Sequence, residues 1–153
     1  MNNPVAINPR IIEGLYCEAL VLSDEVRAAF DFSGRTDAVG LPEDDARVAL
    51  SCEALRTTTR TMHCLAWLLN HRAFLAGELS EFQLRRHGKL ADFPPTDPQR
   101  AILLKAEVRE LVAATERFHA RLRRLDTEWH KRDTAAPSAI ATMRERLSRV
   151  ATG

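Results

Sequence analysis

The sequence lacks the features that mark membrane-spanning, secreted and disulfide-rich proteins. No apolar run approaches the roughly 18 residues that a membrane-spanning helix requires, and the N-terminal stretch MNNPVAINPR has no apolar segment typical of a secretory signal. The three cysteines, Cys17, Cys52 and Cys64, are odd in number and indicate no disulfide framework. These absences predict a cytoplasmic protein with no membrane partner, in which the thiols act as small hydrophobic side chains.

Sequence signatures of common catalytic and metal sites are also missing. The six glycines are scattered, so no phosphate-binding loop is expected, and neither a Gly-x-Ser-x-Gly elbow nor a Cys-x-x-Cys pair occurs. His63 and His71 are eight residues apart, about two helical turns, which is too far to share one metal ion unaided. We therefore expect no catalytic residue, no metal and no cofactor, and hence a protein that is not an enzyme.

Charge is nearly balanced overall but is unevenly distributed along the chain. The formal net charge is +1, which argues against nucleic acid as a partner. Residues 1–97 carry 10 Lys/Arg and 14 Asp/Glu, a net of −4, whereas residues 98–153 carry 12 and 7, a net of +5. The two parts can attract each other within one fold or between subunits, although ordinary solvated helix faces would give the same pattern.

Two long amphipathic helices are predicted in the first half of the chain. The first begins at Asn8-Pro9 and ends at Ser33-Gly34, and the second begins at Leu41-Pro42 and ends at Gly77. The apolar stripe of the first is Ile12, Leu15, Ala19, Leu22, Val26 and Ala29; that of the second is Leu55, Thr58, Met62, Leu65 and Leu69. The run RTTTRT at residues 56–61 favours a strand locally, but the flanking helical pattern is too long to be interrupted there.

A third long helix is predicted from Asp97-Pro98 onwards, after a short helical piece at residues 78–86 and a loop at 88–97. Its seam follows alternating steps of four and three residues: Leu104, Val108, Leu111, Thr115, Phe118, Leu122, Leu125 and Trp129. Residues 131–138 read as a linker, and Ile140, Met143, Leu147 and Val150 predict a short amphipathic helix behind it. The fold class expected is therefore all-α, an antiparallel three-helix bundle over residues 1–130 with a linker and C-terminal tail over 131–153.

Several surface groups are candidates for binding a protein partner. Arg56 and Arg60 lie one turn apart and either form a docking patch for an acidic partner or contribute to an intrahelical ion pair with Glu53. Arg121 and Arg124 belong to a basic cluster that either lies over a bundle end or binds DNA. In the tail, Ile140, Met143 and Leu147 form an apolar face that needs a docking site.

A homodimer is also expected. The second and third long helices carry more apolar residues than one core requires, namely Trp67, Leu68, Leu75, Leu103 and Val112. Trp67, Leu68 and Trp129 are accordingly predicted to be core or dimer anchors.

Two segments resemble a known family. EALRTTTRTMHCLAWLLNHRAFLAGE, residues 53–78, resembles the central helix of the alphaproteobacterial regulator of CtrA degradation (RcdA) family, and LYCEALVLSDEVR, residues 15–27, resembles its first helix. The resemblance implies a dimeric three-helix bundle that works as an adaptor with the ClpXP protease and helps deliver cell-cycle regulators for degradation. The implied partners are ClpX and substrate or response-regulator proteins. The alternative is a helical interaction protein with a different partner, such as a DNA-associated regulator.

Overall fold

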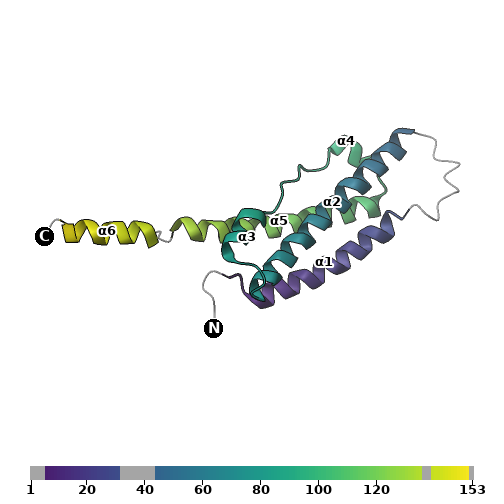
Figure 1. Cartoon of the computed structure of the whole chain (residues 1–153). Coiled ribbons are helices and arrows are strands. Elements are labelled where there is room, and N and C mark those ends of the chain that lie inside the picture. Colours follow the sequence, from purple (N-terminus) through teal and green to yellow (C-terminus); the bar gives the residue numbers. More distant parts are fainter. Residues whose placement is uncertain (1–5, 32–43, 136–138, 152–153) are drawn as a thin grey trace.

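The structure, a computed structural model, describes residues 6–31, 44–135 and 139–151 (Figure 1). Within these ranges it contains six helices and no strand. They are α1 (Pro9–Ala29), α2 (Asp44–Leu75), α3 (Glu81–His87), α4 (Pro98–Ala101), α5 (Ala106–Ala135) and α6 (Ala139–Ala151). The all-α prediction is confirmed.

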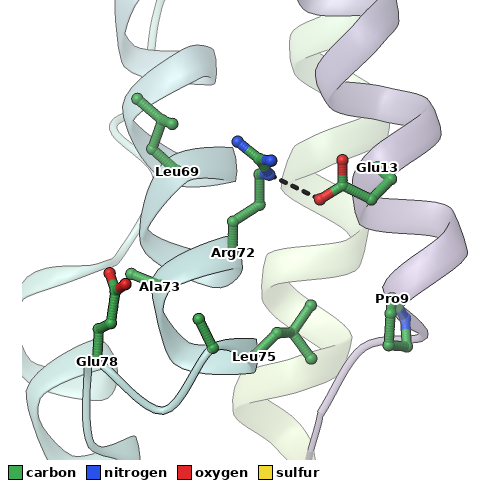
Figure 2. Close-up of a pocket in the computed structure, with 8 residues that line it drawn as sticks. Pro9, Glu13, Leu69, Arg72, Ala73, Leu75 and Glu78 are labelled. Carbon is green, nitrogen blue, oxygen red and sulfur yellow. Dashed lines mark hydrogen bonds and ion pairs between the residues drawn. The ribbon is translucent and has the colours of Figure 1, made fainter.

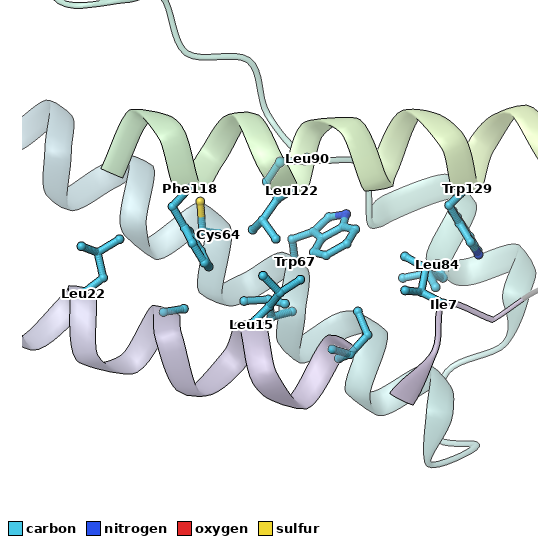
Figure 3. Packing of buried hydrophobic residues seen from close by; sticks show 13 residues of the cluster. Ile7, Leu15, Leu22, Cys64, Trp67, Leu84, Leu90, Phe118, Leu122 and Trp129 are labelled. Carbon is cyan, nitrogen blue, oxygen red and sulfur yellow. The ribbon is translucent and has the colours of Figure 1, made fainter. Parts of the chain in front are cut away.

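Helices α1, α2 and α5 pack against one another around the main hydrophobic core (Figures 1 and 3). The largest buried side chains there are Trp67 and Trp129, which are 2% and 1% exposed. Leu84 of α3 and Leu90 of the following loop close the same core from outside the three long helices. A smaller cluster around Val26, Phe30 and Val112 continues the packing toward the other end of the helices. Removal of these apolar groups from water is the main stabilising contribution to the arrangement.

The apolar stripe of α1 faces the core as predicted. Its buried residues are Ile12, Leu15, Ala19, Leu22 and Val26. The Asn8 side chain caps the helix by accepting a hydrogen bond of 2.9 Å from the Arg10 backbone N–H, and Pro9 occupies the first turn. The helix ends at Ala29, earlier than predicted; the predicted end at Ser33 lies outside the described residues.

The predicted inward stripe of α2 was wrong. Leu55 and Met62 are 71% and 63% exposed, and Thr58 and Leu69 are also exposed; only Leu65 packs partly against the core. The buried face is instead formed by Ala49, Glu53, Ala54, Thr57, Arg60, Thr61, Cys64, Trp67, Leu68 and His71. Thr61 bonds its hydroxyl to the Thr57 carbonyl one turn back, at 2.5 Å, so a threonine methyl group can pack inside.

The third long helix is interrupted near its start. Asp97 caps α4 as predicted, but α4 ends at Ala101 and α5 begins only at Ala106. Between them the backbone forms hydrogen bonds of the 3₁₀ type, in which an N–H donates to the carbonyl three residues earlier. Leu103 donates to Arg100 and Leu104 donates to Ala101, each at 3.1 Å. This turn places Leu104 in a buried position. A single helix from Pro98 was therefore a wrong prediction.

The seam predicted for α5 is correct from Val108 to Trp129. Every member is buried or half-buried, with Thr115, Phe118, Leu122 and Trp129 fully buried. The helix continues to Ala135, so the predicted linker at 131–138 is helical over its first five residues. Residues 136–138 lie outside the described part, and the division of the chain at residue 130 stays a prediction.

The segment from Gly77 to Asp97 connects α2 to α4 across the helices. Ser80 and Gln83 form a reciprocal capping box at the start of α3, with bonds of 3.2 and 2.9 Å, which the sequence reading missed. Gly77 has φ +79°, and at this residue the chain turns away from the axis of α2. The Glu78 N–H donates a hydrogen bond of 2.9 Å to the Ala73 carbonyl. We call residues 88–97 the strap, because their side chains and backbone bind both α2 and α5.

Alanine at the two described glycines with free space around them should have opposite effects. Gly77→Ala is expected to lower the free energy of unfolding by about 1 kcal/mol, because the left-handed backbone penalises a Cβ. Gly14→Ala, inside α1 with no atom within 4 Å of the new Cβ, should raise it by up to about 1 kcal/mol. Urea unfolding followed by circular dichroism measures both. Equal signs for the two variants would contradict this assignment of backbone conformations.

Candidate interaction surface

An apolar row runs along the outside of α2. Val48, Leu55, Met62 and Leu69 are 60%, 71%, 63% and 46% exposed, and each is seven residues from the next. Seven residues are almost two complete helical turns, so the four side chains lie on one face. An ordered row of large apolar side chains in contact with water is typical of an interaction site.

Most of the residues beside this row are small and uncharged, namely Ser51, Cys52, Thr58, Thr59, Ala66 and Ala73. Arg72, three residues after Leu69, is charged, and its side chain is 37% exposed. Between residues 48 and 73 the charged residues of α2 are Glu53, Arg56, Arg60 and Arg72, and all four are bound to other parts of the fold. We call this face, residues 48–73 on the outside of α2, the outer face of α2. Over most of its length it offers a partner an uncharged strip, in a protein in which 28% of residues are charged.

Two hollows lie beside the outer face, in the groove between α1 and α2. One of about 520 Å³ reaches the buried Val26 and Phe30 and is bordered by Met62 and Leu65. The other, of about 470 Å³, is shown in Figure 2. There Arg72 reaches across to Glu13 of α1, with Nε 2.6 Å from Oε1, and its guanidinium lies 4.3 Å from the Tyr16 ring centre. The first hollow therefore combines apolar side chains with the charged Arg27 and Asp31, and the second is crossed by a half-exposed ion pair.

The predicted docking patch was wrong for Arg60, and for Arg56 it stays a prediction. Arg60 is 1% exposed and donates to Thr115 Oγ1 at 2.8 Å, with its second nitrogen 3.6 Å from Glu116 Oε1. Arg56 donates to the carbonyls of Pro94 and Pro95 in the strap, at 2.9 and 3.1 Å. Both arginines thus bind other parts of the fold, and Arg60 presents no charge to a partner.

Arg60 belongs to a buried polar cluster that the sequence analysis missed. Glu53 is 3% exposed and accepts from Thr57 and from Thr96 of the strap, at 3.2 and 3.1 Å. Burial lowers the pKa of the Arg60 guanidinium, while Glu116 and Glu53 oppose that shift. A signal was present in the sequence, since Glu53, Thr57, Arg60, Cys64, Trp67 and His71 also follow steps of four and three residues.

One Glu-x-x-His pair, Glu116 and His119 on α5, was overlooked as a metal-type motif. Both side chains bind the strap: His119 Nε2 is 2.8 Å from the Ala91 carbonyl, and Glu116 accepts from the Thr96 N–H at 3.0 Å. The residues that the structure describes contain no group of three or more His, Cys, Asp or Glu that could hold a metal ion. In the structure, Glu116 and His119 thus attach the strap to α5.

Two buried groups have strongly shifted pKa values. Burial raises the pKa of the Cys64 thiol to about 12, so this thiol stays protonated and is a weak nucleophile. Burial, and secondarily the nearby His130, lowers the pKa of the His71 imidazole to about 4. His71 packs against Trp67 with ring centres 4.1 Å apart, and its Nε2 is buried without a hydrogen-bond partner.

The basic cluster late in α5 is partly neutralised by acidic neighbours. Arg121 Nη1 lies 2.7 Å from Glu18 Oε1, and Arg123 pairs with Asp92 of the strap. Lys131 lies 3.0 Å from Glu128, and Arg124 is exposed. Since carboxylates lie against three of these cations, the cluster is a weaker positive surface than its sequence suggests.

The three predicted anchors, Trp67, Leu68 and Trp129, all lie in the core. Leu68 is fully buried, and the Trp67 indole N–H donates to Asp126 Oδ1 at 2.9 Å. The core alternative therefore holds for them, and the dimer alternative was wrong. Of the residues counted as surplus apolar surface, Val112 is also buried, whereas Leu103 is 42% exposed.

The tail residues Met143 and Leu147 are on the surface of α6, 69% and 68% exposed. Val150 beside them is 81% exposed, so the apolar face predicted from the sequence is in contact with water. The side chain of Ile140 lies outside the described part. Figure 1 shows α6 beyond the end of α5, away from the packed helices.

None of the described helices is long and apolar enough to cross a membrane. Comparison with curated proteins finds no match, and comparison with solved structures finds none either. One family model matches residues 4–151, nearly the whole chain, and its description is a protein of unknown function, DUF1465. The chain belongs to the DUF1465 family.

Proposed function

We propose that this protein is a non-enzymatic adaptor in the cytoplasm that assists the ClpXP protease in degrading cell-cycle regulators. The proposal starts from the resemblance of residues 15–27 and 53–78 to the RcdA family. The observation that carries it furthest is the outer face of α2, since Leu55, Met62 and Leu69 are exposed within the segment that bears the resemblance. An adaptor works through such surfaces, because it brings two proteins together without changing either chemically.

The architecture proposed with this function is an antiparallel three-helix bundle of α1, α2 and α5 that forms a homodimer. The hydrophobic core that these three helices share supports the bundle. The exposed apolar row of α2 supports a dimer, since a row of that length is rarely left in water.

The tail is the proposed contact with the protease or its substrate. Met143 and Leu147 form one face of α6, and Arg144 and Arg146 lie on either side of it. An amphipathic helix with this pattern fits a hydrophobic groove with an acidic border on a partner. ClpX and response-regulator-like substrates are the partners that the resemblance implies.

A degradation assay tests this function. Purified ClpXP, its priming factors and a response-regulator substrate are mixed with and without the full-length protein, and substrate loss is followed on gels. We expect faster substrate loss with the protein present. A Met143→Asp/Leu147→Asp variant should need at least about a hundredfold more protein for the same effect, because burying each of these two side chains contributes roughly 1.5–3 kcal/mol and each 1.4 kcal/mol is tenfold in affinity.

The matched control is Phe82→Asp on α3, which removes an apolar side chain that is 70% exposed but lies outside the tail. It should leave the stimulation unchanged. No stimulation by the wild-type protein at any concentration would refute the adaptor proposal. The DNA-associated alternative gains no support from the paired cations of α5, and a salt-sensitive gel shift would be needed to revive it.

A further inference from the structure

The outer face of α2 contains a heptad seam of its own. Its positions are Val48, Cys52, Leu55, Thr59, Met62, Ala66, Leu69 and Ala73, which follow steps of four, three, four, three, four, three and four residues. Such spacing is the pattern by which one helix packs along another in a coiled coil. Every second member is large and exposed, and every member between is small.

This alternation fits a second copy of α2 in the opposite direction. In an antiparallel pair related by a two-fold axis, residues whose numbers add to 121 lie opposite each other. Each large side chain then faces a small one: Val48 faces Ala73, Leu55 faces Ala66, Met62 faces Thr59 and Leu69 faces Cys52. A parallel pair would instead place Leu55 against Leu55 and Ala66 against Ala66, which alternates crowded layers with empty ones.

We propose that two copies of this chain associate through the outer faces of α2 as an antiparallel pair, with the two-fold axis between residues 60 and 61. This inference rests on the homodimer in the proposed function and names the surface that forms it. No charged residue falls at a seam position, so the contact places no unpaired charge in the interface. The polar residues Ser51 and Asn70 lie opposite each other at its edges.

The size of the seam sets the expected strength. From residue 48 to residue 73 the helix rises about 38 Å, and a helix is about 10 Å wide, so each copy offers roughly 400 Å². Leu65, a partly buried residue beside the same row, adds to this area. The total from two copies is near 1,000 Å², at the low end of specific interfaces, so the dimer should dissociate on dilution.

Cysteine cross-linking tests the register on the full-length chain. In a Cys17→Ser background, which removes an exposed thiol, Leu69→Cys places a new thiol opposite Cys52 of the second copy. Mild oxidation should then give a covalent dimer on a non-reducing gel. Adding Cys52→Ala should abolish the cross-link, because in an antiparallel pair the two introduced thiols lie far apart. Cys64 is buried and should not react.

A parallel pair predicts the reverse, and this outcome would overturn the proposal. In that arrangement Cys52 meets Cys52 without any substitution, and Leu69→Cys cross-links to itself even when Cys52 is absent. The proposal would also be overturned if no cross-link forms and the protein has the mass of one chain in solution up to high micromolar concentration.

Mass in solution tests the surface independently. Light scattering should give twice the chain mass of 17.2 kDa for the wild-type protein at high concentration. Leu55→Glu should give the single-chain mass, because it places a carboxylate against Ala66 in both halves of the seam. The control Val21→Glu, on an α1 residue that is 62% exposed, should remain dimeric. These measurements use the chain alone, so they can fail while the degradation assay succeeds, and the reverse.

Discussion

Replacing Arg60 by alanine is expected to lower the free energy of unfolding by about 3–5 kcal/mol, the effect typical of removing one partner from a buried ion pair. The guanidinium is 1% exposed and faces Thr115, Glu116 and Glu53. Without it, the buried Glu53 side chain loses its charge interaction with Arg60. Urea unfolding, with fluorescence of Trp67 and Trp129 as the signal, would measure the loss.

The matched control is Arg56→Ala, one turn away on the same helix. Its guanidinium is partly exposed and donates to two strap carbonyls, so the loss should be only about 0.5–1.5 kcal/mol. A double variant, Arg60→Ala with Glu53→Gln, should recover part of the stability, because it removes the isolated charge. Losses of equal size for Arg60→Ala and Arg56→Ala would show that the buried cluster contributes little.

Acidification should destabilise the fold through His71, with a loss of up to about 3 kcal/mol. The folded-state pKa of about 4 lies below the ordinary value of 6.5, because the imidazole is buried beside Trp67. The unfolded chain therefore binds a proton more readily between pH 6.5 and 4. The contribution of His71 is complete above pH 6.5 and is lost as pH falls through this window.

The measurement is the free energy of unfolding at several pH values between 7 and 4. The slope expected from His71 alone is about 1.4 kcal/mol per pH unit. His71→Phe keeps an aromatic ring in the site and should flatten this slope, whereas His63→Gln, at an exposed position, should leave it unchanged. A slope that survives in His71→Phe would assign the acid sensitivity to other groups.

Helix α1 and most of α5 could be predicted from the sequence because large apolar residues repeat on one face only. In α1 the stripe from Ile12 to Val26 has no competing apolar row of equal length, so periodicity identified the buried side. The same holds for α5 between Val108 and Trp129. Local signals also gave the starts of α1 and α4, since Asn8-Pro9 and Asp97-Pro98 combine a cap with a proline in the first turn.

Helix α2 could not be oriented in this way because it has two seams. The apolar seam through Leu55 and Met62 is on the outside, whereas the seam through Glu53, Thr57 and Arg60 is inside. A search for regularly spaced apolar residues finds the first seam, because that seam contains the large apolar side chains. The second is buried because polar groups elsewhere in the chain satisfy it, and Trp67 and Leu68 add large apolar area on the same side.

The sequence by itself determined that this protein is helical, and which faces of α1 and α5 lie inside, because helix propensity, caps and periodicity act within a few turns of chain. Only the tertiary structure decided which face of α2 is exposed, that the helix after Pro98 is interrupted, and that Arg60 is internal. Each of these depends on residues far away along the chain, such as Thr115, which is 55 residues from Arg60. A buried polar group is stable only where the fold brings it a hydrogen-bond partner, and the sequence around the group does not show which distant residue that partner is.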